Sequence, residues 1–175
     1  SKGLGELVEA VALLKEKNIN ITLQVAGILD KDDPDRIDIK IIEEWSKLKK
    51  IEWLGQRNDI EKIIKNVNLV VLPTKYSEGV PRIILEACSI GRACIVSNVP
   101  GCQSIIKNGY NGIILERVTA GEIAAQIEQL TLNYPLRCQY GERSSLIIHE
   151  KYDNKIVLKK TYEVYESLLS KRHNS

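Results

Sequence analysis

Short apolar runs alternate with longer amphipathic stretches along most of this chain. Between Leu4 and Leu14, apolar residues recur at the spacing of one helix face, which predicts a helix over residues 3–17. Residues 19–27 alternate in polarity and then turn apolar, which is the pattern of a strand that ends at a glycine. The apolar run within 68–72 is typical of a strand buried on both faces of a parallel sheet.

The rest of the chain repeats this alternation. Further elements are predicted as strands at 51–54, 93–96 and 113–115, as helices at 34–49, 58–66, 81–89, 119–132, 135–150 and 154–170, and as a helical turn near 102–107. Strands that alternate with helices form a parallel sheet covered on both faces. We therefore expect a doubly wound, Rossmann-like α/β domain over 1–170 and a disordered tail over 171–175.

Local signals mark several of the predicted helix starts. Asn58 with Glu61, and Thr119 with Glu122, have the spacing of a capping box. Pro81 suits the first position of a helix, where an N–H group has no intrahelical partner in any case. Since the chain opens with a helix and contains no methionine, we expect it to be an excised piece of a longer protein, without its first strand.

Composition narrows the class of protein. The formal net charge of +2 gives no electrostatic footprint for nucleic acid. The sequence contains no run of 18 apolar residues, so it predicts no membrane span. The cysteines form no Cys-x-x-Cys pair, so we interpret them as reduced thiols rather than as disulfides or a metal site. They are Cys88, Cys94, Cys102 and Cys138.

In an open parallel sheet, ligands bind beyond the carboxyl ends of the strands. The loops expected at that edge are 1–5, 27–33, 55–58, 73–81 and 98–101. Positive charge gathers at the same edge, at Lys2, Arg57, Lys75 and Arg82. Helix starts near the same loops direct free N–H groups to this edge, which suits a phosphate-bearing ligand.

Two common phosphate motifs do not account for this edge. The chain has no Gly-x4-Gly-Lys-Ser/Thr loop, and Gly3 and Gly5 are followed by Val8 where a dinucleotide fingerprint requires a glycine. The sequence therefore disfavours both an NAD site and a P-loop.

Glu86 is the most informative single residue. It lies among apolar residues of the helix predicted at 81–89, where an unpaired carboxylate is costly. A ribose diol offers two hydrogen-bond donors to such a carboxylate. The alternative is a helix-surface carboxylate paired with Arg82, four residues earlier. Glu78, in the preceding loop, is read either as a site residue or as a solvated charge.

These glutamates belong to a longer pattern, Leu72-Pro73-x4-Glu78-Gly79-x6-Leu85-Glu86-Ala87, with Gly91, Val99-Pro100-Gly101 and Asn108-Gly109-x2-Gly112 behind it. The pattern resembles the C-terminal domain of glycosyltransferase family 4, whose hallmark is a pair of glutamates eight residues apart. Lys2-Gly3 and Trp53-Leu54-Gly55 are similar to further motifs of that family. The resemblance covers most of the chain and implies the GT-B architecture, in which two Rossmann-like domains enclose a cleft.

The resemblance also implies roles for individual residues. As catalytic residues, Lys2 would stabilise the negative charge of the leaving diphosphate, and Glu78 would face the donor sugar near the reacting carbon. The substrate-binding residues implied are Gly79, Val80 and Pro81 at sugar and phosphate, Glu86 at the ribose hydroxyls, and Gly55, Gln56 and Arg57 at the base.

The chain departs from the family pattern at several positions. Pro81 removes an N–H donor, Arg82 adds a charge, and Gln103-Ser104 stands where a glutamate often follows the glycine loop. These departures bear on the choice of sugar more than on the chemistry.

The function that the resemblance implies is the donor-binding half of a retaining glycosyltransferase. The expected partner is a nucleoside diphosphate sugar, a UDP-sugar before a GDP-sugar, and the acceptor is a glycan or a lipid-linked group bound by a missing N-terminal domain. We expect no cofactor, no metal and no nucleic acid, and no activity of the isolated domain. The expected location is the cytoplasm, with peripheral membrane contact through the missing domain. The alternative is a non-catalytic α/β module that binds a nucleotide or another protein.

Overall fold

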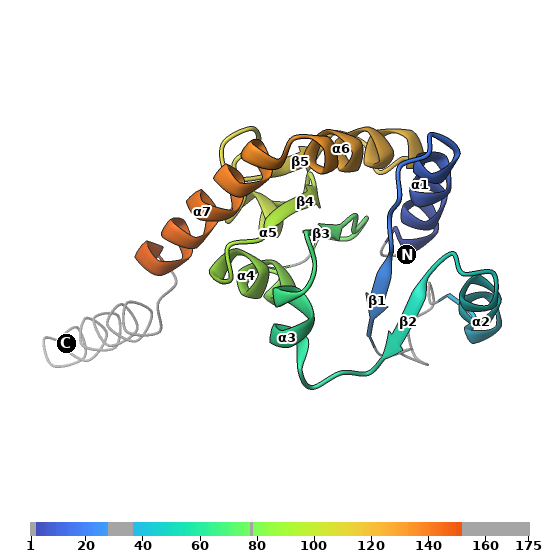
Figure 1. The fold of residues 1–175 in the computed structure, drawn as a ribbon. Coiled ribbons are helices and arrows are strands. Elements are labelled where there is room, and N and C mark those ends of the chain that lie inside the picture. Colours follow the sequence, from blue (N-terminus) through green and yellow to red (C-terminus); the bar gives the residue numbers. More distant parts are fainter. Residues whose placement is uncertain (1–2, 28–36, 78, 152–175) are drawn as a thin grey trace, which may run out of the picture.

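The computed structural model describes residues 3–27, 37–77 and 79–151. Helices and strands alternate along them (Figure 1), as α1 (Leu4–Glu16), β1 (Gln24–Ala26), α2 (Ile39–Lys47), β2 (Glu52–Gly55), α3 (Ile60–Lys65), β3 (Leu69–Leu72), α4 (Arg82–Ser89), β4 (Ala93–Ser97), α5 (Pro100–Gln103), β5 (Ile113–Leu115), α6 (Ala120–Leu132) and α7 (Tyr134–Lys151). The helix predicted at 154–170 and the tail predicted at 171–175 lie outside the described residues.

All strand pairs are parallel and form two sheets. β1 pairs with β2 in one sheet, and β3, β4 and β5 follow one another in the second. Parallel neighbours need a crossover connection, and a helix supplies it between each successive pair of strands. The predicted doubly wound α/β class is confirmed, with the parallel strands divided between two sheets.

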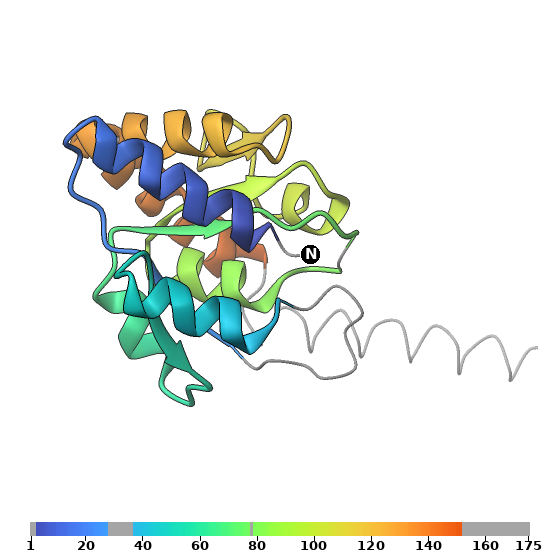
Figure 2. The same ribbon diagram turned by 90° about the vertical axis from the view of Figure 1, so that its right-hand side faces the viewer.

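The strands of the larger sheet send alternate side chains into two separate cores. In β4, Ala93 and Ile95 pack with α1 and α6, whereas Cys94 and Val96 pack with α3 and α4. This division follows from the two-residue period of a strand. Figure 2 shows the resulting layers, with α1 and α6 side by side over one face of the sheet and α4 below it. All five residues of β4 are buried, as a central parallel strand requires.

A third core lies under the smaller sheet. Val8 of α1, Ile42 of α2 and Ile51 before β2 are its buried members. The side chains of Trp45 and Trp53 pack against them from the rim. Since Val8 belongs to α1, this core joins the β1–β2 pair to the helix that also covers the larger sheet.

A close backbone contact joins α7 to the turn between α4 and β4. Gly91 in that turn has a φ of +77°, and a Cβ at Gly141 of α7 would lie 2.0 Å from the Gly91 carbonyl oxygen. A side chain at either position is therefore excluded, at Gly91 by its left-handed backbone and at Gly141 by this contact. The glycine inside α7 is explained by this packing.

Two predicted element starts are wrong by a few residues. The strand predicted at 19–27 is reduced to β1, because its backbone pairs with β2 only over Gln24–Ala26. The side chains of Ile19 and Ile21, before this strand, still pack against the core. The helix predicted at 58–66 runs from Ile60, with Asp59 rather than Asn58 as N-cap. Asp59 makes no side-chain cap because Arg57 holds its carboxylate.

The starts of α4, α5 and α6 differ from the prediction in smaller ways. Pro81 is the N-cap of α4 and not its first helical residue, and the turn predicted near 102–107 begins at Pro100. Thr119 caps α6 as predicted, since its Oγ1 accepts from the N–H of Glu122. The Glu122 carboxylate accepts from the N–H groups of Glu116 and Arg117 in the preceding loop. These bonds replace the bond to the Thr119 N–H that a capping box would contain.

The cysteines are free thiols in the structure. Cys88, Cys94 and Cys102 are buried and Cys138 is partly buried. Cys88 and Cys94 lie on α4 and β4 within the core between these elements, with their Sγ atoms 3.9 Å apart. Cys88, Cys94 and Cys102 therefore serve as packing residues of this core.

A buried asparagine connects the turn before β5 to α7. Asn111 is fully buried, and its Nδ2 donates to the carbonyl of Ile105 at 3.1 Å and to Oγ of Ser144 at 3.2 Å. Its Oδ1 accepts from the N–H of Lys107 at 2.7 Å, and Ser144 Oγ donates back to the Asn111 carbonyl. Every polar atom of this side chain is thus satisfied, as burial demands.

Replacing Asn111 by alanine is expected to destabilise the fold by about 2–3 kcal/mol, because it leaves buried polar groups without partners. The measurement is the midpoint of urea unfolding. Asn68→Ala, at an exposed asparagine, is the control and should shift the midpoint little. Equal midpoints for the two variants would contradict the structural role of the Asn111 network.

Candidate functional site

Within each sheet the strands are parallel, so their carboxyl ends lie at one edge of that sheet. The loops that leave these edges begin at Gly27 and Gln56 in the smaller sheet and at Pro73 and Asn98 in the larger one. The described parts of the predicted loops therefore follow the carboxyl ends of strands. Open parallel sheets bind ligands at such edges.

The start of α1 lies at the same edge, against the end of β3. Gly3, just before α1, is buried and has a φ of +69°. A Cβ on Gly3 would lie 2.1 Å from the carbonyl oxygen of Pro73. This contact brings the predicted Lys2-Gly3 segment next to the loop 73–81, although Lys2 itself lies outside the described residues.

Gly3→Ala should lower the free energy of unfolding by more than about 1 kcal/mol, because alanine combines a left-handed backbone with a backbone clash. Gly5→Ala is the matched control, since Gly5 lies within α1 with open space around it, and alanine favours a helix. Thermal unfolding of both variants measures the difference. A Gly3→Ala variant as stable as Gly5→Ala would contradict the contact with Pro73.

An ion pair ties the loop 73–81 to α1. The Lys75 ammonium donates a hydrogen bond to the Glu6 carboxylate, and this bond holds the pKa of Glu6 below its ordinary value, against the opposing effect of burial. Lys75 was predicted among the positive charges of the ligand-binding edge, and its partner Glu6 was not predicted. No sequence signal joins them, because 69 positions separate the two residues.

The Glu6 pair predicts a pH dependence of stability. A carboxylate whose folded-state pKa is lowered stabilises the fold above its unfolded-state pKa, and this stabilisation is lost as pH falls through the folded-state value. Glu6→Gln should therefore cost about 0.2–1 kcal/mol at pH 7, and the difference from wild type should vanish well below pH 4. Urea unfolding across this range, with Glu9→Gln at an exposed position of α1 as control, measures it. A Glu6→Gln cost that persists at low pH would contradict the ion pair.

The loop before α4 reaches the helix with exposed backbone. Gly79 and Val80 are exposed, while Pro81 is buried. Pro81 offers no side chain that could cap the helix, and its carbonyl accepts from the N–H groups of Ile84 and Leu85. The N-terminal turn of α4 therefore presents a partial positive charge that no capping side chain offsets. Glu78 lies outside the described residues.

Glu86 lies on α4, one turn after Arg82, and is bonded to it. The Arg82 Nε donates to Oε1 of Glu86 at 2.7 Å, with the Arg82 side chain 91% exposed and the Glu86 side chain 29% exposed. The arginine partner is the one that the alternative interpretation of Glu86 required. The half-buried carboxylate also agrees with an apolar surrounding, so the structure contains the features of both interpretations.

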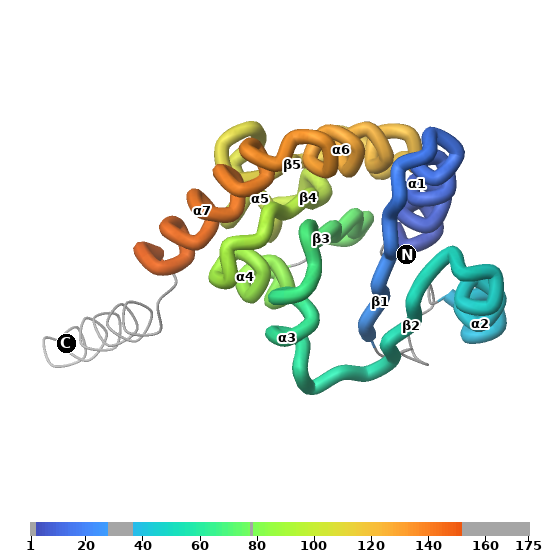
Figure 3. Tube along the Cα trace, viewed as in Figure 1, coloured from blue at the N-terminus to red at the C-terminus, as the bar shows by residue number. Residues whose placement is uncertain are grey.

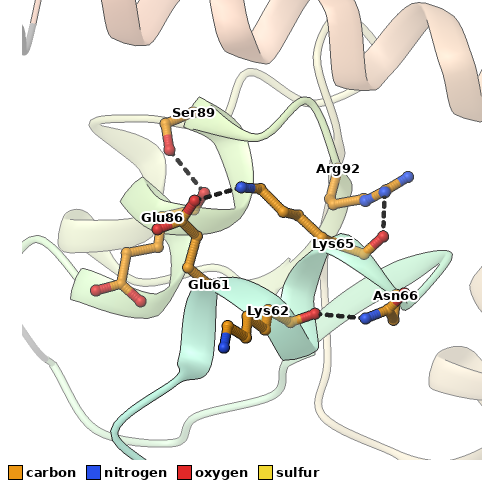
Figure 4. Close-up of polar contacts among 7 residues, drawn as sticks. All are labelled: Glu61, Lys62, Lys65, Asn66, Glu86, Ser89 and Arg92. Atoms are coloured by element: carbon orange, nitrogen blue, oxygen red, sulfur yellow. Dashed lines mark hydrogen bonds and ion pairs between the residues drawn. The ribbon is translucent and has the colours of Figure 1, made fainter.

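Two cations, Lys65 at the end of α3 and Arg92 just before β4, are bonded to groups other than Glu86. Arg92 donates to the carbonyls of Ile64 at 3.1 Å and Lys65 at 2.6 Å, and so caps the carboxyl end of α3. Lys65 pairs with Glu61 on its own helix. Figure 4 shows the Glu86 carboxylate pointing away from Lys65 and Arg92. Among the described residues, the cation that pairs with the Glu86 carboxylate is therefore Arg82.

The loop after β2 carries the residues predicted to meet a base. Gly55 ends the strand with a φ of +63°, and Gln56 and Arg57 are exposed. The Arg57 guanidinium donates to both carboxylate oxygens of Asp59, at 2.8 and 2.7 Å, and this contact lowers the pKa of Asp59. The Arg57 side chain is thus engaged within its own loop.

A cavity of about 1820 Å³ opens between β1 and β3 and connects parts of this edge. Its walls include Gly27, Arg57, Pro73, Arg82 and Glu86. The structure thus brings two of the predicted binding residues, Arg57 and Glu86, to one cavity. The other described candidates are not among its lining residues; they are Gly55, Gln56, Gly79, Val80 and Pro81.

The described residues lack two features. No helix among them combines the length and the apolar character that a membrane span requires. Within the same residues, no three His, Cys, Asp or Glu side chains gather as a metal site would require.

The sequence model of the family described as "Glycosyl transferases group 1" matches residues 1–146. The chain belongs to this family. The fold of this glycosyltransferase domain is that of the Rossmann-like C-terminal domain of GT-B enzymes, as its structural likenesses show.

Individual relatives are similar over almost the whole domain. The N,N'-diacetylbacillosaminyl-diphospho-undecaprenol alpha-1,3-N-acetylgalactosaminyltransferase of Campylobacter jejuni is 28% identical over 168 residues, which are 96% of this chain and 42% of that protein. The capsular polysaccharide biosynthesis glycosyltransferase CapM of Staphylococcus aureus is 26% identical over 96% of this chain and 43% of its own length. The crystal structure of Anabaena HepE in complex with UDP and glucose superposes with a TM-score of 0.81 at 20% identity, over 97% of this chain and 45% of that one. The domain therefore spans less than half the length of these proteins.

Proposed function

We propose that this domain is the donor-binding half of a retaining glycosyltransferase of family 4, which moves a sugar from a nucleoside diphosphate sugar to a glycan or lipid-linked acceptor. The observation that carries the proposal is the half-buried Glu86 carboxylate on a cavity wall, one turn inside a helix whose start has no side-chain cap. Membership in the glycosyltransferase family gives this geometry its chemical setting.

Each end of α4 has a separate task in this proposal. The backbone N–H groups at its start, with those of Gly79 and Val80, attract the diphosphate, because a helix N-terminus favours negative charge. Glu86 accepts hydrogen bonds from the ribose hydroxyls, which are donors of the kind that a carboxylate needs when it is partly buried. In this arrangement the ribose hydroxyls replace the hydrogen bond from Arg82.

The reaction requires charge stabilisation at the leaving group. The bond between the anomeric carbon and the diphosphate oxygen breaks, the acceptor oxygen forms the new bond and loses its proton, and the nucleoside diphosphate leaves with added negative charge. Lys2 stabilises that charge, and Glu78 faces the sugar near its reacting carbon. Both assignments rest on the family resemblance. Since the acceptor side belongs to a second domain, the isolated chain should bind donor without transferring sugar.

The relatives support the choice of partner. A solved structure of the same fold holds UDP and glucose, which favours a UDP-sugar over a GDP-sugar here. The C. jejuni relative is named for a diphospho-undecaprenol acceptor, and the S. aureus relative for capsular polysaccharide. A lipid-linked or polysaccharide acceptor at the inner face of the cytoplasmic membrane, reached through the second domain, follows as part of the proposal.

Glu86→Ala should weaken UDP binding by roughly 10- to 100-fold, since hydrogen bonds to a charged group contribute about 1.5–3 kcal/mol. Calorimetric titration with UDP, GDP and ADP measures affinity and base preference. Glu61→Ala removes a carboxylate from the neighbouring helix α3, where Glu61 pairs with Lys65, and controls for the change of net charge.

A second ligand separates ribose binding from a general effect of the substitution. Wild type should bind UDP more tightly than 2′-deoxy-UDP, and Glu86→Ala should bind the two equally, because the hydroxyl and the carboxylate form one interaction. Retention of the full preference for UDP in Glu86→Ala would overturn the ribose role. Absence of binding of all three nucleotides to the wild-type domain would favour the non-catalytic alternative.

A further inference from the structure

α1 and α2 both end at one side of the smaller sheet. Because β1 and β2 are parallel, the segments that lead from these helices into the strands lie at the same end of the pair (Figure 3). It is the end opposite to the loops that begin at Gly27 and Gln56. A pocket of about 360 Å³ opens between the two segments. The lining residues whose side chains can donate hydrogen bonds are Lys15, Asn20, Thr22, Ser46, Lys49 and Lys50.

Positive charge exceeds negative charge in this pocket. Lys15 Nζ donates to the carbonyl of Lys49 at 3.2 Å, which brings the cation of α1 to the end of α2 beside Lys50. The lining carboxylate is Glu52, and it accepts a hydrogen bond from Gln24 at 2.8 Å. Within the described part of the chain, none of the three lysines forms an ion pair. The carboxyl ends of two helices add only partial negative charge, so the pocket remains positive and attracts anions.

The backbone of Lys49 is unusual for its residue type. α1 and α2 end in the same motif, in which the residue after the C-cap is left-handed and two N–H groups bond back to the last turn. That residue is Asn18 after α1, with a φ of +62°, and Lys49 after α2, with a φ of +52°. Glycine and asparagine suit this position, whereas a lysine adopts it at a cost. Lys47 already places a cation in the last turn of α2, so helix stability does not explain a lysine at position 49.

Ser46 brings a hydroxyl that lacks a partner to the same wall. Its Oγ is buried, and no described residue forms a hydrogen bond with it. A buried hydroxyl without a partner is costly, and a serine inside a helix often donates to the carbonyl four residues earlier instead. Ser46 lines the pocket three residues before Lys49. An acceptor oxygen in the pocket would therefore supply the partner that the fold does not.

We propose that this pocket binds the phosphate group of an anionic ligand, at a site separate from the donor site. Lys15, Lys49 and Lys50 supply the charge, and Ser46 donates a hydrogen bond to a phosphate oxygen. None of these four residues lines the cavity between β1 and β3, although the segment 20–23 borders both spaces. The pocket has the size of a small-molecule site. A soluble phosphate compound and a lipid head group share this chemistry, and the test below separates them.

The first arm titrates the isotope-labelled chain with inorganic pyrophosphate and follows the backbone amide signals of Thr22 and Lys50 by NMR. Sodium chloride at the same ionic strength controls for screening. Lys49→Gly removes a charge and gives the left-handed position the residue that suits it. It should weaken pyrophosphate binding roughly 5-fold, the effect of one lysine at a phosphate surface, and raise the melting temperature. Ser46→Ala should do the same, because alanine favours a helix. Lys40→Gln, at an exposed position in the first turn of α2, is the matched control and should leave binding unchanged.

The second arm uses lipid vesicles to separate the two sources of a phosphate group. Leu48 is 56% exposed next to Lys49, and an apolar side chain beside cations enters the surface of an anionic bilayer. Sedimentation with phosphatidylglycerol vesicles is compared with sedimentation with phosphatidylcholine vesicles, which carry no net charge. Binding to the anionic vesicles alone, weakened by Leu48→Ser, identifies a lipid head group. Pyrophosphate binding that is unchanged in Leu48→Ser, without vesicle binding, identifies a soluble ligand.

Binding of either probe that Lys49→Gly weakens and Lys40→Gln does not supports the proposal. The proposal is overturned if pyrophosphate shifts these signals no more than chloride does and the vesicles do not bind. It is also overturned if Lys49→Gly and Lys40→Gln bind both probes equally well. The amide signals of Gly79 and Val80 report on the proposed donor site in the same titration. Failure at this pocket is therefore distinct from failure of the proposed function.

Discussion

The structure depends on the burial of parallel strands on both faces. Alternate residues of β4 enter separate cores, one under α1 and α6 and the other under α3 and α4, so neither layer of helices can be removed without exposing the sheet. Because helices connect the parallel strands, the strands of each sheet end at one edge of that sheet. Loops from distant parts of the sequence leave these edges, so the position of the candidate site is a consequence of the topology.

Two kinds of interaction hold the loops at this edge. Backbone contacts without side chains set the closest approaches, as between Gly3 and Pro73. Exposed ion pairs then fix individual loops, as Lys75 does with Glu6 and Arg57 with Asp59. Each such pair contributes little to stability, but each removes a cation from the set that could meet a phosphate. In the proposed function, the positive end of α4 and its backbone therefore have a larger part in anion binding than the count of basic residues indicates.

The opening between β1 and β3 relates the fold to the site. Its walls carry Glu86 and Arg57 as well as residues of the two strands.

The sequence by itself determined the fold class, the order of the elements and the cap at Thr119, because these follow from local periodicity and local hydrogen bonds. It also indicated Glu86 as a candidate binding residue, because the residues next to it in the sequence are apolar. It could not determine that β1 is three residues long, that Gly141 is required by Gly91, or that Lys75 binds Glu6. Those features depend on which residues meet across long separations, and the packing of the helices against the sheet decides that.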